Sequence, residues 1–226
     1  MKQLLILCFA ALATACCSNQ PVQEAEIVQT ATPVVHGAEI TLPDPYLHTG
    51  LTIGFALANR RSWREYSPEK LTLEELSGVL FAAAGINRPE NDHLTAPSAL
   101  ALYPIRVYAF FEEGIYRYEA KGHKLVRVKE GNFMAVSGAQ SFVATAALNL
   151  VYVADLSVYA DKSIPAEHVR YLCGQDAAGY AENVNLYTAG TGLRSITRGS
   201  AAPELLQTIG LEGEQYFFAL AQSVGK

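Results

Sequence analysis

Three alternating runs at the centre of the chain most restrict the folds open to it. Residues 105–111, 115–119 and 125–129 are rich in β-branched and aromatic residues, and short turns at Gly114 and Gly122 separate them. Runs joined by turns this short pair with their neighbours as antiparallel strands. The sequence therefore predicts an antiparallel meander, to which the rest of the chain adds its elements.

Apolar periodicity predicts helices before and after this meander. Thr72 and Glu75 form a capping-box pattern at the start of one helix, and Gly190 with Gly192 ends another. The other predicted elements are a helix at 51–59, a helical segment at 133–146, a strand at 149–156, a long helix at 166–187 and a strand at 216–223. This order predicts an α+β fold with a mainly antiparallel sheet flanked by helices, and not a doubly wound sheet.

The N-terminus is typical of an export signal. Residues 4–15 are apolar and follow Lys2, but the run is too short for a mature membrane span. Small residues directly before Cys16 resemble the lipobox of bacterial lipoproteins, which makes Cys16 or Cys17 the predicted lipidation site. Ordinary signal-peptidase cleavage after residues 13–15 is the alternative.

We expect three regions: a lipoprotein signal peptide over 1–16, a flexible tether over 17–45 and a folded domain over 46–226. The tether is polar, interrupted by prolines and without apolar periodicity. The expected location is the bacterial cell envelope, with a lipid anchor as the sole membrane contact.

Composition and motifs argue against several classes of function. The formal net charge is −5, which argues against a nucleic-acid partner. The five His share no ligand spacing, so no metal site is predicted. Gly190-Thr191-Gly192 lacks the third glycine of a dinucleotide fingerprint, and Ser137 lacks the preceding glycine of a nucleophile elbow.

Residues 60–64 read Arg-Arg-Ser-Trp-Arg and place three guanidinium groups close together. Like charges repel unless an anion lies among them, and guanidinium and hydroxyl groups both bind phosphate. The segment therefore predicts an anion site. A solvated helix end is the alternative, because runs of arginine commonly face water.

The order of short motifs resembles the nitroreductase family of FMN enzymes. Ala-Pro-Ser-Ala at 96–99 and Leu-Tyr-Pro at 102–104 are most similar to its azoline-oxidising (SagB-type) branch. The motifs that carry the resemblance are Arg-Arg-Ser-x-Arg-x-Tyr at 60–66, the two segments at 96–104, Gly-Ala-Gln at 138–140, the helix at 179–186, Gly-Leu at 192–193 and Val-Gly at 224–225.

The resemblance implies an intertwined homodimer with FMN at the subunit interface. Arg60, Ser62 and Arg64 would hold the phosphate, and Arg61 would lie nearby or reach the ring. The other implied cofactor-binding residues are Pro97, Ser98 and Ala99 from the partner chain, Tyr103 near the ring, Glu182 and Asn183 on the long helix, and Arg198 and Lys226 on the phosphate side. A core tyrosine at a strand entry is the alternative for Tyr103.

The implied activity is that of an FMN-dependent oxidoreductase acting through flavin N5 on a small organic acceptor. The flavin supplies that chemistry, so no dedicated acid–base pair is expected. The alternative is a flavin-free lipoprotein of the same fold that acts as a binding or structural module. An exported protein would acquire FMN outside the cytoplasm, and that compartment fits the alternative equally well.

Overall fold

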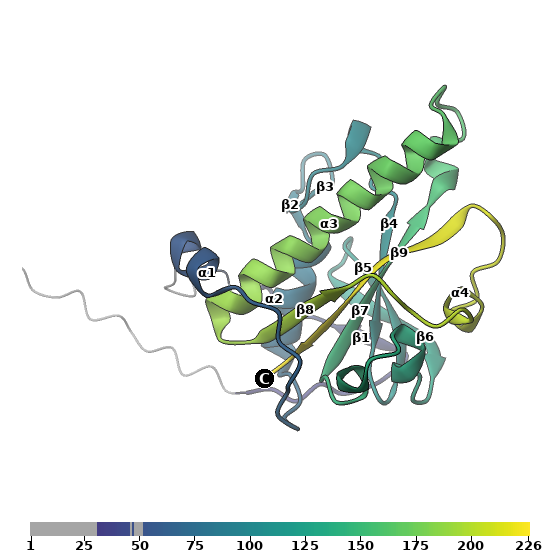
Figure 1. The fold of residues 1–226 in the computed structure, drawn as a ribbon. Helices are drawn as coiled ribbons and strands as arrows, with labels where there is room; N and C mark the ends of the chain where they lie inside the picture. The colour runs from purple at the N-terminus through teal and green to yellow at the C-terminus, as the bar shows by residue number, and fades with distance from the viewer. Residues whose placement is uncertain (1–30, 46, 48–51) are drawn as a thin grey trace, which may run out of the picture. The chain divides into compact units, whose positions relative to one another are not determined.

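The computed structural model describes residues 31–45, 47 and 52–226 (Figure 1). In this part of the chain the centre is a seven-stranded sheet in the order β1-β6-β5-β4-β7-β9-β8. Its strands are β1 (Glu39–Thr41), β4 (Ile105–Phe110), β5 (Gly114–Glu119), β6 (Lys124–Glu130), β7 (Leu148–Asp155), β8 (Arg194–Arg198) and β9 (Tyr216–Gly225). Every pairing between these strands is antiparallel, so the predicted α+β fold with a central antiparallel sheet is confirmed.

Helices and short 3₁₀ helices connect and cover the strands. The helices are α1 (Ile53–Asn59), α2 (Leu73–Ala84), α3 (Ala166–Thr191) and α4 (Leu205–Thr208). The 3₁₀ helices are η1 (Ala99–Ala101), η2 (Met134–Ser137), η3 (Ser141–Ala144) and η4 (Leu156–Tyr159), and a small hairpin pairs β2 (Ile86–Arg88) with β3 (His93–Leu94).

Alternation along the strands builds a separate apolar core on each face of the sheet. Val107 of β4 packs in the core that contains residues of α2 and α3. Tyr108 and Phe110 face the other core, which includes Met134 of η2 and Leu205 of α4. All eight residues of β7 are buried, as expected for a strand covered on both faces.

Helix α2 begins at the predicted capping box, and α3 continues to Thr191, past its predicted end at residue 187. The Glu75 N–H donates to Thr72 Oγ1 at 3.1 Å and Glu75 Oε2 accepts from the Thr72 N–H at 2.7 Å, which completes the capping box of α2. Gly192 has a φ of 78° and caps α3 in the left-handed conformation. Figure 1 shows α3 lying across the sheet.

The predicted tether is wrong over residues 31–45. Glu39–Thr41 pairs with β6, and Ile40 and Leu42 are buried. The alternation of polar Glu39, apolar Ile40, polar Thr41 and apolar Leu42 is short and lies among prolines, so it is a weak strand signal. These residues belong to the folded unit that spans Ala31–Lys226.

The helix predicted for residues 133–146 is also wrong. This segment folds as η2 and η3 with Gly138 between them. A Cβ atom on Gly138 would lie 1.9 Å from a terminal nitrogen of Arg198, so a side chain there would collide with the guanidinium. The segment wraps around a buried arginine, a tertiary contact that local apolar content does not reveal.

The predicted signal peptide and the lipidation site at Cys16 or Cys17 lie outside the described residues. Among the residues that are described, no helix combines the length and the apolar character needed to cross a membrane.

Candidate functional site

The segment at residues 60–64 extends the sheet beyond β8. Ser62 forms a parallel β-bridge with Ser195, and the Trp63 N–H donates to the Ser195 carbonyl oxygen at 3.0 Å. The Arg60 N–H donates to the Ala56 carbonyl oxygen at 2.8 Å and so closes α1. Backbone hydrogen bonds therefore hold the segment at the sheet edge and leave its side chains available.

Extended backbone around Ser62 divides the side chains of this segment between two faces. Arg60, Ser62 and Arg64 share one face, because successive side chains of an extended chain point to opposite sides. Arg61 and Trp63 share the other, and the Arg61 guanidinium carbon lies 5.2 Å from the centroid of the Trp63 ring. The predicted cluster of three arginines is thus one pair and one separate cation.

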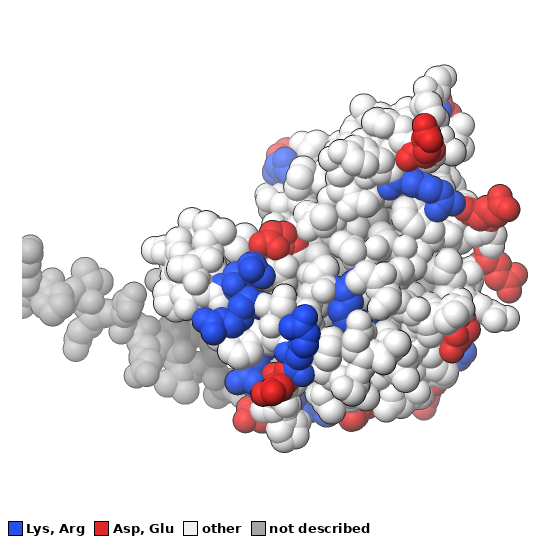
Figure 2. Space-filling model, viewed as in Figure 1, with Lys and Arg blue, Asp and Glu red and all other residues white. Residues whose placement is uncertain are grey.

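The arginines of this segment have no carboxylate partner within the part of the chain that the structure describes. Arg60, Arg61 and Arg64 are exposed, and no ion pair within the described residues includes them. Figure 2 shows Lys and Arg side chains gathered beside α1 and around β8. Two uncompensated guanidinium groups flanking a hydroxyl on one face can bind a phosphate through charge-assisted hydrogen bonds.

Arg198 lies in a different environment. It is 4% exposed and donates to the Ser137 carbonyl oxygen at 2.6 Å and to Asn149 Oδ1 at 3.1 Å, while its Nε has no hydrogen-bond partner among the described residues. Burial lowers the pKa of the Arg198 guanidinium to about 10. Its neighbour Thr197 faces Asn185 of α3, so by alternation Arg198 points away from α3.

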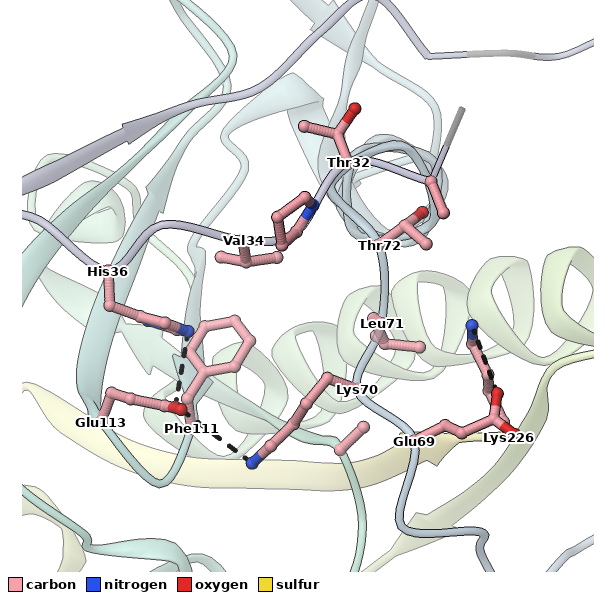
Figure 3. Close-up of a pocket in the computed structure, with 13 residues that line it drawn as sticks. Thr32, Val34, His36, Glu69, Lys70, Leu71, Thr72, Phe111, Glu113 and Lys226 are labelled. Carbon is pink, nitrogen blue, oxygen red and sulfur yellow. Dashed lines mark ion pairs between the residues drawn. The ribbon is translucent and has the colours of Figure 1, made fainter. Parts of the chain in front are cut away.

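Lys226 points into another region. Its Nζ lies 3.2 Å from Glu75 Oε2 and 3.9 Å from Glu69 Oε2, and it lines a cavity of about 400 Å³ (Figure 3). Figure 3 also shows ion pairs from Glu113 to His36 and Lys70 across this cavity. The charges here already have opposite partners, unlike those of residues 60–64.

The second predicted stretch, at residues 97–103, is held by a buried carboxylate. The Ser98 hydroxyl donates to Asp176 Oδ2 at 2.6 Å, and the Ala99 N–H donates to Asp176 Oδ1 at 3.2 Å. The Ser98 oxygen also accepts from the Tyr103 N–H at 2.9 Å. Burial raises the pKa of Asp176, and the hydrogen bonds from Ser98 and Ala99 partly oppose that shift.

This loop has a tight backbone. Leu100, Ala101 and Tyr103 have φ values of 56°, 53° and 47°, a region that residues with side chains seldom occupy. Tyr103 is half-buried, and its ring centroid lies 5.7 Å from that of His93. The hydrogen bonds from Ser98 and Ala99 to Asp176 therefore help to hold the loop in this left-handed backbone conformation.

Glu182 and Asn183 lie on α3, next to a network of buried polar groups. Glu182 is exposed and its Oε2 accepts from Asn185 Nδ2 at 2.9 Å, while Asn183 is half-buried. Asn185 Oδ1 in turn accepts from Ser195 Oγ at 3.0 Å and from Gln222 Nε2 at 2.8 Å. The network connects the middle of α3 with the strand that pairs with Ser62.

A single chain does not bring the two predicted stretches together. The segment at 60–64 lines a cavity with Ala189 and Gly192 near the end of α3. Pro97 instead packs beside Gly179 of the same helix. Ten helical residues separate Gly179 from Ala189, which corresponds to about 15 Å at 1.5 Å per residue.

Sequence reasoning missed Asp176 and Arg194. Asp176 falls on the apolar stripe of α3 next to Cys173, Ala177 and Tyr180, and an acid in such a stripe was the available signal. Arg194 lies 4.7 Å from the Trp63 ring centroid, a contact that depends on the pairing of β8 with residues 60–64. No group of three or more His, Cys, Asp or Glu side chains in the described part of the chain could hold a metal ion.

Comparisons with known proteins give a consistent picture. The model of the nitroreductase family matches residues 57–226. A nitroreductase homologue from Methanocaldococcus jannaschii is 34% identical over 176 residues, which cover 72% of this chain and 84% of the relative.

Solved structures share the fold. A nitroreductase homologue from Ralstonia eutropha JMP134 is 32% identical with a TM-score of 0.78, over 88% of this chain and 94% of that one. A homologue from Exiguobacterium sibiricum 255-15, solved in complex with FMN, is 16% identical with a TM-score of 0.55, over 82% of this chain and 90% of that one. Because the family model spans well over half of its residues, this chain belongs to the nitroreductase family.

Proposed function

We propose that the protein is an FMN-dependent oxidoreductase that acts on a small organic acceptor. Members of the nitroreductase family are oxidoreductases, and solved structures with the same fold include FMN complexes. Bound flavin supplies hydride transfer at its N5 atom, and the protein supplies position and electrostatics.

The observation that carries this proposal is the β-bridge at Ser62, from which alternation places Arg60, Ser62 and Arg64 on one face. The two guanidinium groups are exposed and have no carboxylate partner among the described residues. Hydrogen bonds to charged groups contribute about 1.5–3 kcal/mol each, so three such donors could offset the desolvation of a phosphate. These residues would hold the FMN phosphate.

We further propose a homodimer in which the loop at 97–103 reaches the partner's flavin. About 15 Å along α3 separate this loop from the segment at 60–64 of the same chain, which supports a second chain as its source. Within the loop, the Ser98 hydroxyl donates its hydrogen bond to Asp176, so its role is to shape the loop and to present Pro97 and Ala99.

Two finer assignments accompany the proposal. The Ala-Pro-Ser-Ala and Leu-Tyr-Pro segments at 96–104 favour the azoline-oxidising branch. The apolar N-terminus and Cys16 or Cys17 favour export to the bacterial cell envelope and attachment by lipid. Mass spectrometry of the protein isolated from membranes would identify the lipidated residue.

Flavin content of the purified protein tests the cofactor assignment. We expect visible flavin bands, or uptake of added FMN by the colourless protein, together with oxidation of a reduced electron donor. Replacing both Arg60 and Ser62 by Ala should weaken FMN binding about 10²-fold or more, because one charge-assisted contact and one hydroxyl contact are lost.

The matched control is Lys121→Ala, which removes an exposed charge whose nearest acid, Asp92, is 3.5 Å away. It should bind FMN as the unchanged protein does. A folded protein that takes up no FMN would favour the flavin-free binding or structural module instead.

A further inference from the structure

We propose that Arg61, Arg194 and Trp63 form a second anion-binding site on the face opposite Arg60, Ser62 and Arg64. Its ligand is a small organic anion, with a phosphate or carboxylate group held by the two arginines and an apolar body in the adjoining cavity. This assignment moves Arg61 out of the predicted cofactor site.

The two guanidinium groups converge on one indole ring. Their central carbons lie 5.2 Å (Arg61) and 4.7 Å (Arg194) from the centroid of the Trp63 ring. Because both distances share that centroid, the two carbons are no farther apart than the sum, about 10 Å. Both cations therefore border the same ring, where the phosphate or carboxylate group of a ligand can contact them.

Neither cation is neutralised by an acidic side chain of the described residues. No ion pair in the described residues includes Arg61 or Arg194. Arg194 is fixed by a hydrogen bond to the Glu65 carbonyl oxygen at 2.9 Å, which orients the group without neutralising its charge. Two oriented like charges beside one ring favour an anion between them.

The cavity beside these residues indicates that the ligand has an apolar body. It has a volume of about 390 Å³, within the usual range for small-molecule pockets. Phe55, Leu193 and Ala189 supply apolar walls, and Asn59 supplies an amide. A bare inorganic anion would leave these walls in water, so an anion with an apolar body fits better.

The site contains its own reporter, because Trp63 is the single tryptophan of the chain. Phenyl phosphate and benzoate should each change the fluorescence of the FMN-free and FMN-loaded proteins in a saturable way. Phenol should have no saturable effect, and inorganic phosphate should bind more weakly than phenyl phosphate. Potassium chloride at matched ionic strength controls for screening.

Variants separate this site from the cofactor site. Arg61→Gln and Arg194→Gln should each raise the dissociation constant of phenyl phosphate at least about tenfold, since each removes a charge-assisted contact. Arg60→Gln and Lys121→Gln should leave it within about twofold. Circular dichroism confirms that each variant is folded.

Two results would overturn the proposal: no saturable response to either aromatic anion, or equal loss of binding in Arg60→Gln. Failure of FMN uptake would leave the fluorescence experiment intact, so the two assignments fail separately.

Discussion

At the scale of single residues, buried polar side chains determine the shape of the loops around the candidate site. Asp176 is 6% exposed and accepts hydrogen bonds from Ser98 Oγ and the Ala99 N–H. Burial raises the pKa of Asp176, because the charged carboxylate loses its contact with water. The hydrogen bonds from Ser98 and Ala99 partly replace the hydrogen bonds to water that the buried carboxylate has lost.

Asp176→Ala should lower the free energy of unfolding by about 1–3 kcal/mol, because Ser98 and Ala99 would lose their acceptor while still partly buried. Urea unfolding measures this change. Asp161→Ala is the control, since Asp161 is exposed and paired with the adjacent Lys162. Equal stabilities of the two variants would contradict the role assigned to Asp176.

His123 forms a hydrogen-bond chain whose direction can be assigned. Ser77 Oγ lies 2.6 Å from the Pro43 carbonyl oxygen and 2.7 Å from His123 Nε2, and Tyr118 Oη lies 2.7 Å from His123 Nδ1. The single Ser77 proton goes to Pro43, so Nε2 carries a proton and donates to Ser77. Burial lowers the pKa of His123 and so favours the neutral ring, in which Nδ1 accepts from Tyr118.

Stability should therefore depend on pH through His123. Burial lowers the pKa of His123 in the folded state, against a weaker opposite effect of Asp44. The unfolded chain then binds more protons over the range between the lowered pKa and about 6.5, so the free energy of unfolding falls as pH decreases through that range. Urea unfolding at a series of pH values measures the slope.

His123→Gln should reduce the slope of the free energy of unfolding against pH. The remaining slope would come from groups such as His36, whose pKa is also lowered by burial. A slope unchanged by the substitution would show that the folded state does not favour neutral His123.

The cationic residues of the site could be predicted from sequence, but the side of the segment on which each of them lies could not. Three arginines within residues 60–64 are plain in the chain. Which of them lie together depends on the bridge between Ser62 and Ser195, a contact between residues far apart in sequence. Arg198 shows the same limit, because its burial follows from the wrapping of η2 and η3.

At the scale of elements, the contact between α2 and α3 depends on a glycine. A Cβ atom on Gly78 would lie 1.9 Å from the Tyr187 hydroxyl oxygen and 2.4 Å from the ring carbon that bears it. The Tyr187 side chain of α3 therefore fills the space that a Cβ atom at residue 78 of α2 would need.

Gly78→Ala should lower the free energy of unfolding by about 1–3 kcal/mol through this overlap, although alanine favours a helix interior. Gly174→Ala on α3 is the matched control, since nothing lies within 4 Å of its Cβ position. It should raise the free energy of unfolding by about 0.5–1 kcal/mol. Thermal or urea unfolding measures the change in the free energy of unfolding for each variant. Stabilisation of the protein by both substitutions would contradict the close packing at Gly78.

Elements with strong local signals could be predicted, and those that depend on partners could not. The capping box of α2, the alternation of β4 and β5 and the glycine after α3 are local features, and all three elements form. Strand β8 is five residues long and pairs with β9 across a loop and α4, so its pattern carries little local information. The same reasoning applies to β1.

At the scale of the whole described unit, residues 31–45 belong to the fold. Ile40→Ala should lower the free energy of unfolding by about 2–4 kcal/mol, because Ile40 is 4% exposed and packs in the α2–α3 core. Val35→Ala is the control, since Val35 is 77% exposed. Equal, small effects in urea unfolding would mean that the segment does act as a tether.

The bridge between Ser62 and Ser195 has a consequence beyond the site. Strand β8 is the last of the sheet, and an uncovered last strand offers its backbone to other molecules. The arginine-bearing segment occupies that backbone, and its positive charges repel another copy approaching the same place. A chain whose residues 60–64 are pulled away would be expected to self-associate in solution, so loss of ligand binding and loss of solubility would then appear together.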